Sequence, residues 1–248
     1  MRGEKNVIYE NSLGQRLVFD NKKLFIESID MTGNSGIHAV ENLAFADGQS
    51  SVYHQLAAKT IPCSFSLKNV KLDTYTKLYL ESIFNPKISG VLTVITKKDI
   101  YRIECRPQNV PSFKRDGKIA YRFDVDFMAD FPYWQKGAEI PLTLSSYETF
   151  LYSNNPIDLP MKVIFPAGNS SPFGVNGKGF TLKIHDFTLT VNTQNFKVTN
   201  ESGQNCNQYI DAAAPLDKVY FRFGENKIFC PVYSGVQIFY YNLSFGEI

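Results

Sequence analysis

The alternation of apolar and polar residues is most regular between Ile119 and Trp134. Every odd position from 119 to 133 is apolar, whereas the polar even positions are Arg122, Asp124, Asp126 and Asp130. A period of two sustained over this length is typical of a strand with one buried face and is hard to place on a helix. Pro132 has no amide proton to donate to a ladder, so we expect the strand to end there, with Tyr133 and Trp134 as a bulky cap.

Similar patterns predict further strands in the first half, at residues 7–9, 17–19, 24–29, 61–67, 91–96 and 101–105. One helix is expected, because Asp73 can cap it, Asn85-Pro86 can stop it, and apolar residues between them recur at helical spacing, namely Leu72, Tyr75, Leu78, Tyr79 and Ile83. Segment 31–55 is rich in glycine and lacks periodicity. We interpret it as a long loop or arm that serves as a contact element.

The second half predicts short strands only. Residues 161–165 alternate, 166–179 suggest a polar loop, and 180–184 with 187–191 suggest a hairpin that turns at His185-Asp186. Further strands are expected at 196–198, 219–223, 228–229 and 236–245, at the spacing of a sandwich or barrel. The composition loosens at residues 135–137, which predicts two domains, 1–136 and 137–248.

The composition of the chain favours a globular β protein, because 20 Phe and 14 Tyr occur in 248 residues. A net charge of +2 does not mark it as a nucleic-acid or membrane-surface binder. Cys63, Cys105, Cys206 and Cys230 have no paired spacing, so we expect buried thiols instead of disulfides or a zinc site. We expect no signal peptide and no membrane span, because apolar runs are too short.

Asp124 and Asp126 are the strongest candidates for catalysis, since two carboxylates two residues apart on a strand lie about 6 to 7 Å apart on one face. That separation suits glycoside hydrolysis, but it is far more typical of the solvated face of a half-buried strand, which we favour. Metal sites are not expected. The three histidines are isolated in sequence and are expected at the surface or in turns: His38, His54 and His185.

Two further groups have a structural and a binding interpretation. Lys114, Arg115 and Lys118 cluster at a hairpin tip, where they could contact phosphate but are more often solubilising charge. Aromatic residues of the second half could form a stacking platform for sugars, although core and sheet positions are the commoner fate of such residues: Tyr147, Tyr152, Tyr209, Tyr233, Tyr240 and Tyr241.

The order of several segments resembles the distal tail proteins of siphophages that infect Gram-positive bacteria. In the first 136 residues the resemblance is carried by IYENSLGQRLVFDN, SIFNPKISGVLTV, YRIECRPQNVP and FDVDFMADFPYW. In the second half it is looser and is carried by FTLTVNTQNFKVTN, by PLDKVYFRFGENKIF and by a terminal aromatic strand.

This resemblance implies a mainly β protein with one helix in a ring-forming N-terminal domain and a galectin-like or carbohydrate-module-like C-terminal β-sandwich. The implied role is that of a virion structural hub without enzymatic activity or cofactors. It implies a ring, usually a hexamer, that is assembled in the host cytoplasm and joins the tail tube protein to tip and receptor-binding proteins at the end of the tail. The alternative is a carbohydrate-binding adhesin or accessory module that acts through the second domain.

Within this role, one hypothesis is that Asp124, Asp126 and Asp130 line the lumen of the ring. A negative wall lets DNA pass without binding, because phosphate contacts produce affinity. The alternative, which we favour on the sequence alone, is that Arg102 and Arg106 of a neighbouring strand neutralise these carboxylates.

Overall fold

The structure is a computed structural model and describes residues 6–32, 36–42, 49–68, 72–117, 120–212 and 215–246. The chain divides into two compact units: unit 1 is Met1–Lys136 with Ser244–Ile248, and unit 2 is Gly137–Leu243. The last residues therefore return to unit 1, although the sequence assigned them to a second domain. Independent folding of two domains stays a prediction.

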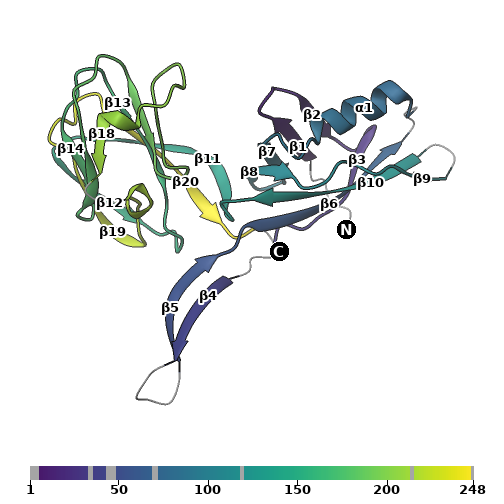
Figure 1. The fold of residues 1–248 in the computed structure, drawn as a ribbon, viewed down its shortest axis with the longest axis horizontal. Helices are drawn as coiled ribbons and strands as arrows, with labels where there is room; N and C mark the ends of the chain where they lie inside the picture. Colours follow the sequence, from purple (N-terminus) through teal and green to yellow (C-terminus); the bar gives the residue numbers. More distant parts are fainter. Residues whose placement is uncertain are drawn as a thin grey trace. The chain divides into compact units, whose positions relative to one another are not determined.

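Unit 1 is built from two antiparallel ladders, which meet where the end of one strand of the second ladder pairs with the last strand of the first (Figure 1). The first ladder has the order β2-β1-β7-β8, with β1 at Asn6–Asn11, β2 at Arg16–Phe19, β7 at Gly90–Ile95 and β8 at Ile100–Pro107. The second has the order β3-β6-β10, with β3 at Leu24–Ile29, β6 at Lys59–Lys68 and β10 at Ala120–Ala129. Short β9 (Lys114–Asp116) pairs with the start of β10, and the end of β10 meets β8 at Phe127↔Pro107 and Met128↔Arg106.

The predicted alternation of β10 is confirmed, because Phe123, Val125, Phe127 and Ala129 are buried. Their side chains join those of β1, β2, β6, β7 and β8 in one hydrophobic core. Stacked and tilted rings link these strands: Phe65 lies 4.1 Å from Phe19 and 5.4 Å from Phe123 between ring centroids. The strand ends as expected before Pro132, but Trp134 is not an end cap. It is fully buried and begins the next strand, β11 (Trp134–Thr143).

The predicted helix is present as α1 (Thr74–Ile83), next to the β1–β2 hairpin (Figure 1). Asp73 caps it by accepting a hydrogen bond from the Thr76 amide at 2.8 Å. Leu80 and Ile83 are buried in the core of unit 1. The apolar residues one and two turns earlier are exposed to solvent: Tyr75, Leu78 and Tyr79. The helix is therefore held mainly by its last turn.

Segment 31–55, expected to be a loop or arm, contains a hairpin. Strands β4 (Gly36–Asn42) and β5 (Gln49–Leu56) pair antiparallel with each other and form a separate two-stranded sheet. The loop half of the expectation was wrong, whereas an arm built as a β-ribbon agrees with it, and its role as a contact element stays a prediction. The sequence shows no hydrophobic period from which the two strands could be predicted.

Unit 2 consists of two sheets packed face to face. One has the order β17-β16-β13-β20-β11, with β13 at Met161–Phe165, β16 at Leu189–Asn192, β17 at Lys197–Thr199 and β20 at Gln237–Ser244. The other has the order β12-β19-β14-β15-β18, with β12 at Glu148–Ser153, β14 at Pro172–Val175, β15 at Lys178–Leu182, β18 at Ile210–Ala212 and β19 at Gly224–Phe229. Phe165 of the first sheet lies 5.6 Å from Phe173 and 6.0 Å from Phe180 of the second, between ring centroids. These rings mark the core of the sandwich.

Two pairing predictions in unit 2 were wrong. The supposed loop 166–179 contains β14 and the start of β15, joined by Asn176-Gly177 with φ of 52° and 76°. Two successive positive φ values are those of a two-residue hairpin turn, for which Asn-Gly is a strong signal. The supposed hairpin of 180–191 is absent, since β15 pairs with β14 and β18, whereas β16 pairs with β13 and β17.

Other expected strands of unit 2 appear with shifted bounds. Residues 219–223 form only an isolated bridge, Leu159↔Phe221, in place of a strand. Two short 3₁₀ turns, Asn207–Tyr209 and Leu216–Lys218, precede this region. Among the residues that the structure describes, no helix is both long and apolar enough to cross a membrane.

Candidate functional site

The polar face of β10 and β6 presents the acidic residues expected to be functional. Asp124 and Asp126 are exposed on β10, and the register places them opposite Ser64 and Pro62 of β6. Ser64 donates a hydrogen bond from its hydroxyl to Asp124 Oδ1 at 2.6 Å. Because successive side chains of a strand alternate between faces, burial of the odd residues of β10 fixes both carboxylates on the solvent side.

Asn109 braces the backbone that carries these two carboxylates. Its Oδ1 accepts a hydrogen bond from the Asp126 amide at 2.8 Å, and its Nδ2 donates to the Asp124 carbonyl at 3.0 Å. The Gln108 amide also donates to the Asp126 carbonyl, at 2.7 Å. The side chain of Asn109 thus satisfies the backbone of β10 at residues 124 and 126, just before the residues that pair with β8.

Ion pairs neutralise part of the charge around this face. Arg122 Nε lies 2.7 Å from Asp116 Oδ2, and Lys68 Nζ lies 3.6 Å from Glu27 Oε1. In contrast, no cation lies within ion-pair distance of Asp124 or Asp126 in the described part of the chain. The uncompensated negative charge of the face therefore comes from these two residues.

Asp130 differs from the other two candidates. It follows the end of β10, is exposed, and lies 3.6 Å from Arg106 Nη2. Of the expected pairing between Arg102, Arg106 and the acidic face, the described residues therefore contain only the ion pair between Arg106 and Asp130. Arg102 lies opposite Thr93 and Gln135 in the ladders of β8, away from β10.

The geometry of Asp124 and Asp126 does not resemble a glycosidase centre. Both side chains lie on an open strand face, where a glycosidic bond would not be enclosed or shielded from water. Among the described residues, no three His, Cys, Asp or Glu side chains are grouped so that they could hold a metal ion. The solvated strand face, favoured by the sequence, is what the structure contains.

The three histidines were expected at the surface or in turns, and the structure describes the side chain of His185 only. His185 lies in a turn but is buried, and its Nδ1 lies 2.9 Å from the Lys183 carbonyl oxygen, to which it can donate. His38 and His54 stand opposite each other in the β4–β5 register, which their distance in sequence concealed; their side chains lie outside the described residues. In the basic cluster, Lys114 and Arg115 are exposed on β9, and Lys118 lies outside the described residues.

All four cysteines are free and buried, as predicted. Burial raises the pKa of Cys105 to about 12 and that of Cys230 to about 11, and it also raises the pKa of Cys63. Thiols with raised pKa values carry little thiolate at neutral pH, so they are poor nucleophiles and poor metal ligands.

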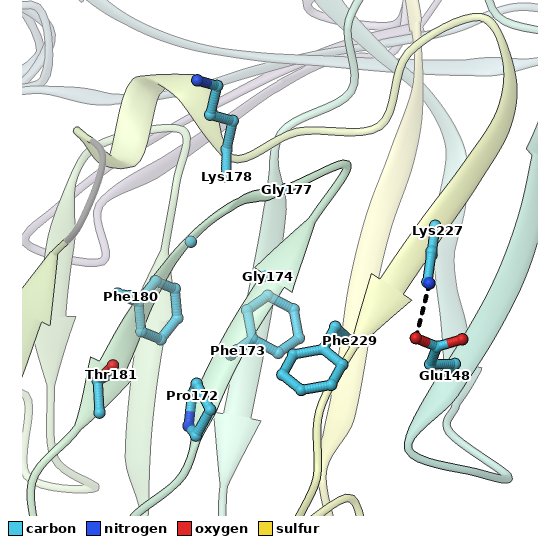
Figure 2. A pocket seen from close by; sticks show the side chains of 11 residues that line it. Glu148, Pro172, Phe173, Gly174, Gly177, Lys178, Phe180, Thr181, Lys227 and Phe229 are labelled. Carbon is cyan, nitrogen blue, oxygen red and sulfur yellow. Dashed lines mark ion pairs between the residues drawn. The ribbon is translucent and has the colours of Figure 1, made fainter.

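None of the six tyrosines singled out in the sequence belongs to the buried core, but Tyr152, Tyr240 and Tyr241 lie in strands, in agreement with the expected sheet positions. Tyr147 and Tyr152 are mostly exposed near the β12 edge. Sequence reasoning missed Phe150 and Phe229, which are also exposed on this sheet. For Phe150 the sequence did hold a signal, because Phe150 and Tyr152 are two residues apart and therefore share one face of a strand. A pocket of about 380 Å³ lies beside Phe229 (Figure 2).

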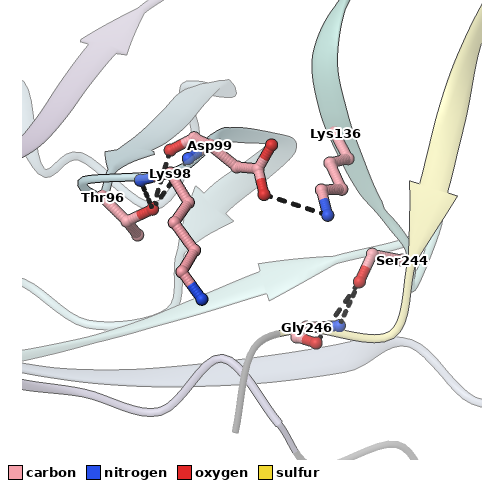
Figure 3. Close-up of polar contacts among 6 residues, drawn as sticks. All are labelled: Thr96, Lys98, Asp99, Lys136, Ser244 and Gly246. Atoms are coloured by element: carbon pink, nitrogen blue, oxygen red, sulfur yellow. Dashed lines mark hydrogen bonds and ion pairs between the residues drawn. The ribbon is translucent and has the colours of Figure 1, made fainter.

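Lys59 is a second residue that the sequence did not single out. It is buried at the start of β6, and its Nζ donates a hydrogen bond to the Phe245 carbonyl at 2.6 Å. Nearby, the Ser244 hydroxyl and Gly246 form a local turn, and Lys136 Nζ lies 3.0 Å from Asp99 Oδ2 (Figure 3). Burial lowers the pKa of Lys59 to about 8, partly opposed by Asp30. Lys59 thus fixes the returning end of the chain to unit 1.

Comparison with known proteins finds similarity at the level of structure. No protein-family model matches the sequence, and no curated protein matches it. The crystal structure of the SPP1 Dit (gp 19.1) protein, described as a paradigm of hub adsorption apparatus in Gram-positive infecting phages, matches with a TM-score of 0.63 and 11% identity. That match covers 96% of this chain and 99% of the Dit chain.

Two baseplate structures give the same result. A chain of the phage P2 baseplate in its activated conformation with Ca matches with a TM-score of 0.58 and 10% identity, covering 98% of this chain and 99% of that one. A chain of the phage p2 baseplate in its activated conformation with Sr matches with a TM-score of 0.55 and 11% identity, covering 95% and 97%. Over nearly its whole length, the chain therefore has the mainly β fold of the SPP1 Dit hub protein and of a phage baseplate component.

Proposed function

We propose that this chain is a virion structural protein, a distal tail hub that assembles as a hexameric ring. The observation that carries the proposal is the match to the SPP1 Dit hub protein, which spans 96% of this chain and so includes residues of both units. A likeness confined to one β-sandwich would suit many functions, because such sandwiches occur in unrelated proteins. A likeness that runs through both units in order is much more specific.

In this proposal the ring joins the tail tube protein to the baseplate or tail tip and anchors tip and receptor-binding proteins. It is assembled in the host cytoplasm and lies at the tail tip of the virion. The chain then works by positioning partners instead of by catalysis, which is compatible with carboxylates on an open face and with thiols whose pKa values are raised. A ring is also the natural outcome of head-to-tail contacts between identical copies when their rotation closes.

Light scattering of the purified full-length protein, combined with electron microscopy of the same sample, tests the ring. We expect particles of about six copies with a central opening. Because a ring could require its neighbour to close, the measurement is repeated with the tail tube protein of the same virion added. A chain that stays monomeric in both conditions contradicts the hexameric hub.

We further propose that Asp124, Asp126 and Asp130 line the lumen through which DNA passes. Asp124 and Asp126 supply uncompensated negative charge, and Asp130 adds a carboxylate shared with Arg106. A wall of this sign disfavours phosphate contacts, which are the main source of non-specific DNA affinity. DNA can then slide without being held.

Replacing all three aspartates with Lys should slow DNA ejection from particles of normal morphology, and added salt should restore part of the rate because salt weakens phosphate contacts. The matched control replaces three exposed acidic residues of unit 2 with Lys: Glu201, Asp211 and Asp217. Ejection at the normal rate from intact particles carrying the aspartate variant would sink the lumen assignment.

A further inference from the structure

The pocket beside Phe229 is an open trough on the outer face of the β12-β19-β14-β15-β18 sheet. It has a volume of about 380 Å³, within the range of small-molecule sites. The residues that line it come from four neighbouring strands and the β14–β15 turn (Figure 2), and they include Glu148, Pro172, Gly174, Lys178, Thr181 and Phe229. The ring of Phe229 stands on one side of the trough, next to Glu148 and Lys227 (Figure 2).

Glycines keep the floor of the trough free of side chains. The register places Gly174 of β14 between Phe229 of β19 and Gly179 of β15. A side chain at Gly179 would collide with the Phe173 carbonyl oxygen, and one at Gly174 would come within 3.1 Å of the Lys178 carbonyl oxygen. A flat ligand can therefore lie against the sheet beside the ring of Phe229.

Glu148 and Lys227 supply hydrogen-bonding groups at this wall. Glu148 Oε1 lies 2.6 Å from Lys227 Nζ, and both side chains are partly exposed. A carboxylate that accepts one bond from an ammonium keeps further acceptor sites, and the ammonium keeps two further protons. The pair can thus receive a hydrogen bond from one hydroxyl of a ligand and donate to the neighbouring hydroxyl.

Lys178 adds positive charge at the β14–β15 turn. It is exposed, and within the described ranges no carboxylate lies at ion-pair distance from its ammonium. With the Glu148–Lys227 pair close to neutral, the trough has a net positive charge. It accommodates a neutral ligand and favours one with a carboxylate.

We propose that this trough binds one pyranose ring of a polysaccharide, with the apolar face of the sugar against Phe229 and two adjacent hydroxyls on Glu148 and Lys227. A sugar ring combines one flat apolar face with a polar rim, which matches one aromatic wall, a flat glycine floor and one ion pair. The site goes beyond a hub role and does not depend on it.

Two other ligand classes fit the trough less well. An extended peptide could not add to the sheet here, because β14 and β15 lie inside the sheet and their edges are already paired with β19 and β18. A wholly apolar ligand would desolvate the Glu148–Lys227 pair without replacing its contacts with water, which is unfavourable.

Saturation-transfer NMR of the full-length protein with glucose, N-acetylglucosamine and glucuronic acid, each titrated to about 10 mM, tests the site. We expect a dissociation constant of about 1 mM for at least one of these sugars, and tighter binding of glucuronic acid than of glucose. Phe229→Ala should weaken binding at least about tenfold, because it removes the aromatic wall. Glu148→Gln should weaken it severalfold, because it removes the charged acceptor.

A third variant and a control distinguish loss of the binding site from a general loss of folded structure. Thr181→Trp fills the trough without removing any proposed contact and should abolish transfer. Tyr152→Ala removes an exposed aromatic side chain of the same sheet that does not line the trough, and binding should be unchanged. Absence of transfer from all three sugars, or binding that survives both Phe229→Ala and Thr181→Trp, overturns the proposal. Neither result bears on ring assembly, which is measured separately.

Discussion

Replacing Lys59 with Met should remove a specific pH dependence of stability. Lys59 is 1% exposed and donates a hydrogen bond to the Phe245 carbonyl. Its pKa of about 8 in the folded protein compares with an ordinary lysine value of about 10.4. Between these two values the unfolded chain binds more protons than the folded one, so Lys59 makes stability rise as pH increases.

The magnitude follows from the two pKa values. The difference in unfolding free energy between wild type and Lys59→Met should rise by about 2 kcal/mol between pH 7 and about 9.5, and by about 3 kcal/mol in total above pH 10.5. At pH 7 the variant should be about as stable as wild type. The variant is stabilised because it no longer buries an ammonium. It is destabilised by a similar amount because the Phe245 carbonyl loses its hydrogen bond and is left unsatisfied.

Urea unfolding of both proteins at a series of pH values measures this difference. The cysteines oppose the trend in each protein separately, because their raised pKa values make stability fall as the unfolded thiols ionise above about pH 9. The contribution of the cysteines is the same in both proteins, so it cancels when the unfolding free energy of the variant is subtracted from that of wild type. Lys136→Met is the control, since the hydrogen bond to Asp99 raises the pKa of Lys136 and gives no rise in this range. If the difference in unfolding free energy between wild type and Lys59→Met does not change with pH, burial does not lower the pKa of Lys59 and the reasoning is refuted.

Three further outcomes test other parts of the fold. Asp73→Ala should lower the unfolding free energy by about 1 kcal/mol, measured by urea unfolding, because it removes the cap of α1. Phe84→Ala should lower it by about 3 to 5 kcal/mol in the same assay, because it opens a cavity beside Tyr9 and Phe127. Cys105 should stay unmodified when the native protein is treated with a thiol reagent at pH 8 and should react in urea, because its thiol is buried and its pKa is raised to about 12. Labelling of Cys105 in the native state at the rate of the unfolded chain would contradict that burial.

The proposed lumen face and the trough lie in different units of the molecule. The acidic face lies on β10 of unit 1, and the trough lies on a sheet of unit 2. A lumen face works by having few attractive contacts, so its charge is spread along an open strand. A sugar site needs convergent contacts, so its residues surround a hollow. The two proposals can therefore be tested with separate sets of variants.

Sequence alone determined features that depend on neighbouring residues. The alternation of β10 predicted which of its residues are buried and placed Asp124 and Asp126 on the solvent face, because a strand has a period of two. Asp73 at the start and Asn85-Pro86 after the end located α1 correctly, since caps and stops act over a few residues. The order of short segments also indicated the family resemblance before any fold was known.

Only the tertiary structure decided the features that depend on distant residues. Strand β15 pairs with β14 and β18 instead of with β16, because the two sheets of unit 2 compete for partners across the whole unit. Arg106 reaches Asp130, whereas Arg102 lies away from β10, because register is set by long-range packing. Burial of Lys59 and the trough beside Phe229 arise where separate segments meet. Local pattern fixes which face of a strand is buried, but it cannot specify which segment covers that face.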